Sequence, residues 1–248
     1  MLTRVHHVGL VVRRLEDGLA FWQDALGLQV SKQATVADQG VKAALLPIGR
    51  SEIELLEPID PAGGVAKFLE KRGEGLHHVC FETPDVAGEL ERARGAGFPL
   101  IDETPRAGLA GTICFLHPKG THGVLVEFAT PPPGDAHHTS AGRGALAGLA
   151  LGEVTARSRD TGAAATLFVD KLCLERAGAD AVTVGGVRLR FLADDTGGEG
   201  LAGLVLDVAD AGAARAALED YGPAAEPDGF HLDPARCRGV SLRLRRGA

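Results

Sequence analysis

Two histidine and glutamate pairs could do chemistry, because they recur in the chain at nearly the same spacing. His7 precedes Glu54 by 47 positions, and His78 precedes Glu127 by 49. Imidazole and carboxylate together suit a borderline divalent cation such as zinc, cobalt, nickel, manganese or iron, and a set without thiolate argues against a structural zinc site. The four residues therefore predict one divalent metal ion, whose identity the sequence leaves open.

These four residues lie in segments that read as β-strands, in which side chains alternate between two faces. Glu54 lies between Ile53 and Leu55, and these apolar neighbours suit packing beneath a helix, which sends the glutamate to the opposite face. By the same alternation, the side chains of His7, His78 and Glu127 also point to the face opposite their apolar neighbours. We therefore expect four ligands on one concave side.

The other histidines are assigned different roles. His6 and His77, the first members of the two His-His pairs, point to the opposite face by the same period and are expected to support the ligands from behind or to pack. His137 and His138 follow a Pro-rich stretch and are expected to be solvated. A single strand histidine is more often hydrogen-bonded or exposed than a ligand, so the prediction rests on the joint pattern.

The chain repeats one structural unit. A His-His-Val sequence opens a strand near residue 5 and another near residue 76, and a helical pattern follows each. An apolar stripe predicts a helix over 15–26 that stops before Gly27, and Asp85 is expected to cap a second helix ending near residue 95. Strand-like runs then follow: Val41–Ile48, Ile53–Leu56, Thr112–Leu116 and Val124–Phe128.

The second half carries the same pattern in weaker form, since Glu153–Leu174 aligns without a gap on His7–Leu28. A duplication of a duplication predicts an α+β fold of four tandem βαβββ modules in two domains. We expect a metal-binding domain over 1–130, a Pro/Gly-rich linker over 131–145 and a degenerate domain without metal ligands over 146–248.

The second half provides an internal comparison. The alignment places Glu153 where His7 stands, Arg190 at Glu54, Gly203 at His78 and Arg243 at Glu127. Two cations in place of two anions would repel a divalent ion. This half is expected to be a structural partner, with an anion or substrate role as the alternative.

Composition excludes several classes of partner. The formal net charge is −7, with 13 basic and 17 acidic residues in 1–130 and 13 and 16 in 131–248, so nucleic acid is not an expected partner. Charged residues interrupt the one apolar stretch near the N-terminus, and no later run is long enough to span a bilayer. Four cysteines without CxxC spacing fit a reducing, cytoplasmic setting. We expect a monomer or homodimer.

These residues resemble the vicinal oxygen chelate (glyoxalase/bleomycin resistance/dioxygenase) superfamily, and within it the methylmalonyl-CoA epimerases. The resemblance covers residues 4–130. His117-Pro-Lys119 and Ala66-Lys-Phe-Leu69 look like the epimerases rather than glyoxalase I. The remaining motifs that carry it are Val5–Leu10, Ile53–Pro58, Gly75–Cys80 and Gly123–Glu127.

The resemblance implies that His7, Glu54, His78 and Glu127 are the metal ligands. It also shows departures: epimerases often have Gln where Glu54 stands, and some have a catalytic glutamate where this chain has Ala43. The long second half is a further departure, because a typical epimerase ends near residue 130 of this numbering and dimerises. Residues 145–248 could take the place of a partner subunit.

The resemblance implies a metal-dependent isomerase that moves a proton next to a carbonyl, with an acyl-CoA among the candidate small-molecule substrates. Glu127 is the candidate base. Asp38, Lys42, Glu52 or water could be a second. The alternatives are a glyoxalase I-like lyase (lactoylglutathione lyase), which Glu54 supports, a non-catalytic small-molecule binding protein, and an extradiol dioxygenase, which a fourth protein ligand disfavours.

Overall fold

The computed structural model describes residues 1–134, 142–194 and 198–247. His137 and His138, and part of the expected linker, lie outside the described residues. Among the described residues no helix has both the length and the apolar character needed to cross a membrane.

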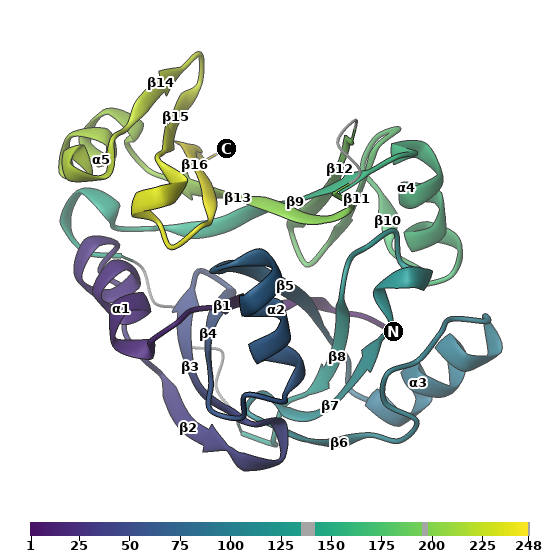
Figure 1. The fold of residues 1–248 in the computed structure, drawn as a ribbon. Coiled ribbons are helices and arrows are strands. Elements are labelled where there is room, and N and C mark those ends of the chain that lie inside the picture. Colours follow the sequence, from purple (N-terminus) through teal and green to yellow (C-terminus); the bar gives the residue numbers. More distant parts are fainter. Residues whose placement is uncertain (135–141, 195–197, 248) are drawn as a thin grey trace. The chain divides into compact units, whose positions relative to one another are not determined.

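The strands form two eight-stranded mixed sheets (Figure 1), one in the order β2-β3-β4-β1-β5-β8-β7-β6 and the other β10-β11-β12-β9-β13-β16-β15-β14. The first sheet comprises β1 Arg4–Val11, β2 Lys32–Val36, β3 Val41–Ile48, β4 Ser51–Pro58, β5 Gly75–Glu82, β6 Arg106–Gly108, β7 Gly111–Leu116 and β8 Val126–Thr130. The second comprises β9 Ala150–Ser158, β10 Glu175–Arg176, β11 Ala181–Val184, β12 Val187–Ala193, β13 Gly200–Val208, β14 Ala224–Glu226, β15 Gly229–Leu232 and β16 Ser241–Arg246.

Each group of four strands has one helix directly after its first strand. The helices are α1 Leu15–Leu19, which continues as η1 Ala20–Ala25, α3 Val86–Gly95, α4 Thr161–Asp170 and α5 Ala211–Ala217, with α2 Gly64–Arg72 between the first two modules. The order strand, helix, three strands occurs four times. This confirms the predicted α+β fold of four βαβββ modules.

Contacts cluster into two compact units. The first holds the described residues within 1–7, 78–136 and 153–202, and the second those within 8–77, 137–152 and 203–248. Each unit thus takes segments from both sides of the expected linker. The domain boundaries drawn from the sequence stay a prediction.

The first helix follows its apolar stripe but changes pitch. Trp22 and Leu26 are fully buried, and the N–H of Leu26 donates to the carbonyl of Phe21, five residues back, at 3.3 Å, so the second part of the predicted helix has a wider turn. Gly27 ends it with φ +75°, as predicted. At the start, Glu57 of β4 accepts a hydrogen bond from Leu15 N at 2.7 Å.

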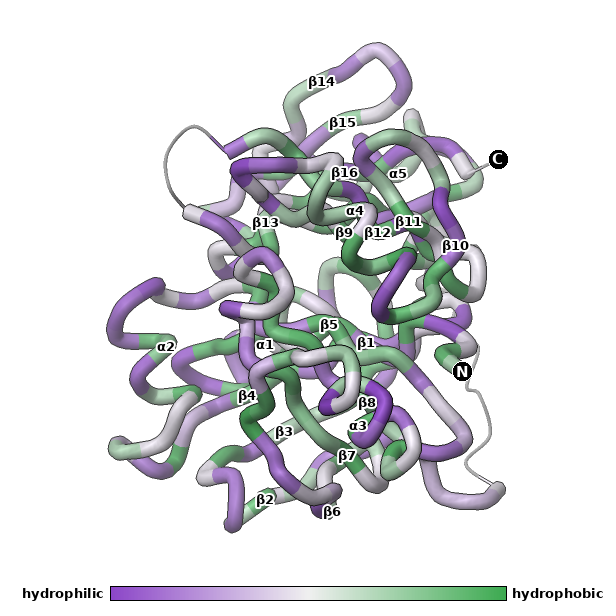
Figure 2. The backbone as a smooth tube through the Cα atoms, turned by 90° about the vertical axis from the view of Figure 1, so that its right-hand side faces the viewer, coloured by the Kyte–Doolittle hydropathy of each residue, from purple (hydrophilic) through white to green (hydrophobic). Residues whose placement is uncertain are grey.

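Strand β1 is buried along its whole length, and β3, β4, β7 and β8 are mostly buried, so both faces of these strands are covered. Figure 2 shows hydrophobic residues along β7 and a mixture of hydrophilic and hydrophobic residues along α2. Strand β8 begins at Val126, two residues later than predicted. The reason is local, because Val124 N donates to Thr121 O at 3.1 Å and closes a turn.

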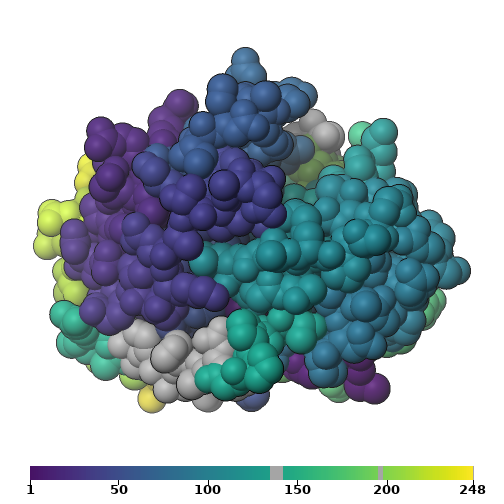
Figure 3. Space-filling view, turned by 90° about the horizontal axis from the view of Figure 1, so that it is seen from below, coloured from purple at the N-terminus to yellow at the C-terminus, as the bar shows by residue number. Residues whose placement is uncertain are grey.

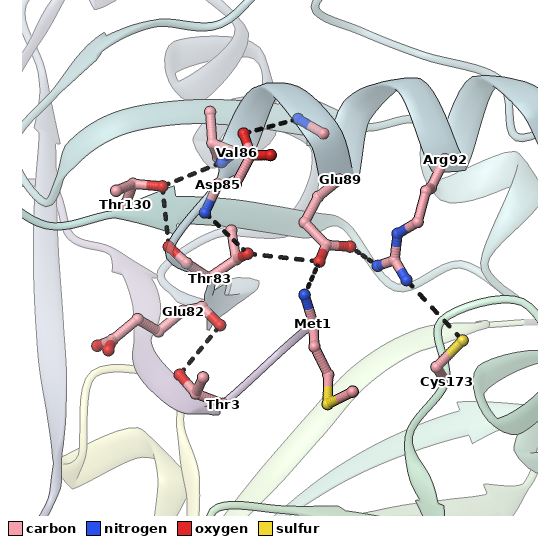
Figure 4. A network of polar contacts seen from close by, with 11 residues as sticks. Met1, Thr3, Glu82, Thr83, Asp85, Val86, Glu89, Arg92, Thr130 and Cys173 are labelled. Carbon is pink, nitrogen blue, oxygen red and sulfur yellow. Dashed lines mark hydrogen bonds and ion pairs between the residues drawn. The ribbon is translucent and has the colours of Figure 1, made fainter.

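Helix α3 is tied to β5 and β8 by polar contacts (Figure 4). Asp85 Oδ1 accepts from Gly88 N at 2.9 Å, which confirms the predicted cap. Thr130 Oγ1 donates to Thr83 O at 2.8 Å and accepts from Val86 N at 3.1 Å. The blue surface of α3 adjoins the teal surface of β6 and β7 in Figure 3. The helix therefore fixes the strand that carries Glu127.

The carboxylate of Glu89 is the buried centre of this network, at 3% exposure. It lies 2.5 Å from the Met1 ammonium, 3.4 Å from Thr83 Oγ1 and in an ion pair with Arg92. Removal of a buried carboxylate leaves its partners uncompensated.

Glu89→Ala is expected to lower the free energy of unfolding by about 2 kcal/mol, since Glu89 is buried but its cationic partners are screened by solvent, and to lower Tm by about 4–8 °C. Arg92→Ala is the matched control, because the Arg92 side chain is 46% exposed, and should cost much less. Calorimetry measures both. Equal losses in the two variants would contradict a central role for the glutamate.

The four cysteines are free, three of them buried and Cys173 exposed. Burial raises the pKa of Cys114 and of Cys237 to about 12, so neither thiol is ionised at neutral pH. We expect a thiol reagent at pH 8 to modify one cysteine per native chain and four after denaturation. Cys173→Ser should abolish the native reaction. Rapid modification of a second thiol in native protein would contradict this accessibility.

Candidate metal centre

Three of the predicted ligands lie at the corners of one small triangle. His7 comes from β1, His78 from β5 and Glu127 from β8. The Nε2 atoms of the two histidines are 3.0 Å apart. Oε2 of Glu127 lies 3.0 Å from His7 Nε2 and 2.9 Å from His78 Nε2. The strands thus bring together residues that are far apart in the sequence.

The triangle is buried, with exposures of 0% for His7, 2% for His78 and 3% for Glu127. Oε2 of Glu127 has no hydrogen bond of acceptable geometry among the described residues, despite its short distances to both rings. A buried carboxylate oxygen in this position is costly unless a cation or donor compensates it.

Electrostatics keep Glu127 ionised. Burial raises the pKa of its carboxyl, but the charge of His7 and the contacts with His7 and His78 lower it by more, so the net pKa lies well below the usual range. An ionised carboxylate is the form that binds a metal ion.

The donor set fits a divalent ion. Two ligand atoms about 2.05 Å from a metal and at right angles to each other are about 2.9 Å apart, and a tetrahedral arrangement places them about 3.3 Å apart. The observed separations of 2.9–3.0 Å match the first value. Three such atoms suit three neighbouring positions around one cation.

Glu54, the fourth predicted ligand, lies on β4 and is 6% exposed. His7, Glu54 and His78 each offer one ligand atom, and these atoms lie within 4.8 Å of one another. The two histidines are thus common to both groups of three, one completed by Glu127 and the other by Glu54.

The first members of the two His-His pairs lie beside different neighbours. His6 is buried, and its Nδ1 lies 2.9 Å from Nδ1 of His7, a contact that leaves Nε2 of His7 for the triangle. Such contacts orient metal-binding histidines. His77 instead packs edge-on against Phe68 of α2, with ring centroids 4.9 Å apart.

The sequence did not single out the side chains around the triangle in this module. Phe115 pairs directly with Glu127 across β7 and β8, and its ring packs edge-on against His78 at 5.3 Å. The guanidinium of Arg106 lies 5.5 Å from the Phe115 centroid, and Arg106 Nε donates to Asp102 at 2.9 Å. The signal that could have found Phe115 is hairpin register, since directly opposed residues share a face.

Apolar side chains surround Phe115 on the face of the sheet that carries Glu127. One buried cluster combines residues of β5, β7 and β8 with the turn before β7. Its members are Cys80, Ala110, Ile113, Phe115 and Ala129, with Leu125 packed against it. A ligand near Glu127 would meet an apolar wall.

The pairing of β3 with β4 shows on which face of the sheet the candidates for a second base lie. Lys42 pairs with Glu57 across β3 and β4, and Leu45 pairs with Glu54, so by alternation Lys42 lies on the face opposite Glu54. Its Nζ donates to Glu57 at 3.0 Å. Glu52, two residues before Glu54, shares the Glu54 face.

Two other candidate positions differ in exposure. Ala43 pairs with Leu56 on the Glu54 face and is 1% exposed. Asp38 is exposed in the short helix Ala37–Gln39. Among the charged candidates on β3 and β4, Glu52 is the one on the Glu54 face, and its Oε1 accepts a hydrogen bond from Ser31 Oγ at 3.1 Å.

Comparison with known proteins gives a consistent family. Residues 6–115 match the model of the Glyoxalase/Bleomycin resistance protein/Dioxygenase superfamily. An ethylmalonyl-CoA/methylmalonyl-CoA epimerase of Cereibacter sphaeroides is 35% identical over 52% of this chain and 98% of its own length. The mitochondrial methylmalonyl-CoA epimerase of Homo sapiens is 34% identical over 51% of this chain and 73% of its own.

Solved structures agree. A Streptomyces coelicolor methylmalonyl-CoA epimerase variant in complex with 2-nitronate-propionyl-CoA is 37% identical, covers 53% of this chain and 99% of its own, and has a TM-score of 0.52. A 4-hydroxymandelate synthase variant from the same organism covers 100% of this chain and 94% of its own at a TM-score of 0.71 and 17% identity, which shows the fold alone. The family match and the epimerase relatives, which are 34–35% identical over most of their own length, show that this chain belongs to the glyoxalase/bleomycin resistance protein/dioxygenase superfamily.

Proposed function

We propose that this protein is a divalent-metal-dependent isomerase that transfers a proton next to the carbonyl of an acyl-CoA, in the manner of methylmalonyl-CoA epimerase. The observation that carries the proposal is the buried triangle of His7, His78 and Glu127, with separations of 2.9–3.0 Å. The epimerase relatives, at about 35% identity over half the chain, support the reaction class.

In this proposal His7, His78, Glu127 and Glu54 hold one ion, either cobalt, zinc, nickel, manganese or iron. When bound, the ion supplies Lewis-acid polarisation of a carbonyl oxygen. Imidazoles and carboxylates together are compatible with each of these metals. His6 keeps the His7 ring in its orientation through the Nδ1 contact of 2.9 Å.

Proton transfer falls to carboxylates of the chain. Glu127 is proposed to accept the proton next to the carbonyl at one of its carboxylate oxygens, and Glu52 or water to exchange a proton on the other side. Buried Phe115 and the apolar cluster around it exclude water from the Glu127 side of the reacting carbon.

A glyoxalase I-like lyase is the second candidate, because Glu54 is the residue expected there. The epimerase-like His117-Pro118-Lys119 element has a local role in this chain: His117 Nδ1 accepts from Lys119 N at 3.1 Å and caps a short helical turn that leads toward β8. This contact explains the element by turn geometry and does not discriminate between the two reactions.

Metal binding is expected to depend on His78 and not on its neighbour. Wild-type protein should bind one equivalent of Co²⁺ by elemental analysis, and an ion at about 100 times its Kd should raise the free energy of unfolding by about 2.7 kcal/mol. His78→Ala should lose the metal. His77→Ala is the matched control, since His77 packs on Phe68, and should keep it. Equal metal loss in both variants would contradict the assignment.

Turnover is tested with one epimer of methylmalonyl-CoA in deuterated water, followed by NMR. We expect deuterium incorporation and inversion with metal present, and a rate at least about 100-fold lower in Glu127→Gln. Protein that binds metal but catalyses no exchange would rule out the epimerase. The thiol adduct of a ketoaldehyde should then be converted if the lyase is correct, and neither substrate if the protein only binds.

A further inference from the structure

The third module carries a group of charged side chains on one face of β9 and β12, two paired strands that are labelled in Figure 1. In the parallel pairing of these strands, Arg188 lies opposite Glu153 and Arg190 opposite Thr155. Residues two apart on a strand share a face, as do directly paired residues. Glu153, Arg188 and Arg190 therefore lie on the same face, at the place where the first half carries His7.

The contacts within this group are long. Oε2 of Glu153 lies 3.5 Å from Nη2 of Arg190 and 3.8 Å from Nη1 of Arg188. Charge-assisted hydrogen bonds between guanidinium and carboxylate are about 2.7–2.9 Å long. The two guanidinium groups thus flank one carboxylate oxygen without closing on it.

Polar atoms of the group lack hydrogen bonds. Among the described residues, neither Oε2 of Glu153 nor Nε of Arg190 has a hydrogen-bond partner, and both atoms are buried. Glu153 is 4% exposed, whereas the side chains of Arg188 and Arg190 are 42% and 37% exposed. Solvent can therefore reach N–H donors of both arginines, while the buried carboxylate of Glu153 lies on the other side of the guanidinium groups.

The fourth module differs in its number of carboxylates, although Nε of Arg243 also lacks a hydrogen bond of acceptable geometry among the described residues. Arg243, at the place of Glu127, donates from Nη2 to Asp228 at 2.7 Å, and its Nε lies 2.5 Å from Glu226 Oε2. Two carboxylates neutralise one arginine there. In the third module, one carboxylate faces two arginines.

Charge on the third-module face remains positive after its other members are counted. By alternation Arg157 of β9 lies on this face, and Glu175 of β10 lies on it through its pairing with Thr183. Both are exposed, and their charges cancel. Arg188 and Arg190 against Glu153 leave one net positive charge with guanidinium donors that the chain does not saturate.

We propose that this face binds the phosphate group of a small molecule between Arg188 and Arg190, where the buried carboxylate of Glu153 competes with the ligand for both guanidinium groups. A phosphate offers several oxygens to the two planar forks, which a single carboxylate oxygen at 3.5 and 3.8 Å does not satisfy. The site is separate from the proposed metal centre, and its test is independent of the proposed catalysis.

Calorimetric titration of the full chain with inorganic phosphate and with adenosine 3′,5′-bisphosphate tests the site, and the Arg190 variants assign nucleotide binding to this face rather than to the proposed acyl-CoA site. We expect binding that weakens as NaCl rises. Stronger binding of the nucleotide would identify a phosphorylated organic ligand, and equal binding would identify free phosphate. Acetate, which has one carboxylate, should bind more weakly than either.

Variants give effects of opposite sign. Arg190→Gln should weaken phosphate binding by about tenfold or more, because a charged donor is lost, and Arg190→Lys should restore only part of it. Glu153→Gln should strengthen binding, since the competing negative charge is gone. Arg243→Gln is the matched control in the fourth module and should bind as the wild type does.

Circular dichroism establishes that each variant is folded. If Arg190→Gln does not fold, Arg190→Lys and Glu153→Gln still decide the question. No binding of either phosphate probe to folded wild-type protein, or weaker binding in Glu153→Gln, would overturn the proposal and leave the group as an internal ion triad.

Discussion

A carboxylate oxygen placed 2.9–3.0 Å from two imidazole nitrogens in a buried position is the constraint on which the first half depends. Such a group is expensive to bury without compensation, because the acidic oxygen lacks an aligned donor and the polar atoms have left water. The elements around it make this arrangement possible: apolar residues beneath each strand hold β1, β5 and β8, and α3 is fastened to β5 and β8 by Thr83 and Thr130.

The two halves show what happens to the same architecture when the central charges change. In the first half, histidines and glutamates converge on one point and suit a cation. In the second, Glu153, Arg190 and Arg243 occupy corresponding places; Arg190 lies beside the carboxylate of Glu153, and Arg243 lies beside those of Glu226 and Asp228. The βαβββ framework accommodates both sets of charged residues, because its apolar core lies on the opposite face of the strands.

Much of the fold was predictable because it depends on local periodicity. Period-two alternation at Glu54 and Glu127, the helical stripe ending at Gly27 and the Asp85 cap are each properties of a few neighbouring residues. The wider turn near Leu26 and the late start of β8 were not, since they depend on how the backbone closes particular hydrogen bonds.

The candidate site divides in the same way. Repeated spacing pointed to His7, His78 and Glu127, but Phe115 and Arg106 became visible only through strand register and ring packing, which link residues with no shared periodicity. Likewise, only the pairing of β3 with β4 shows that Lys42 lies on the face opposite Glu54.

The doubled histidines at the starts of β1 and β5 have a consequence for accuracy of folding. A strand that slipped by one residue would still present an imidazole inward, His6 in place of His7 or His77 in place of His78, so the ring chemistry alone does not distinguish correct from shifted pairing. The aliphatic neighbours do. A slip would turn Val8 and Val79, both fully buried, out of the core. The register that presents His7 and His78 toward Glu127 is thus enforced by two valines on the other face of the strands.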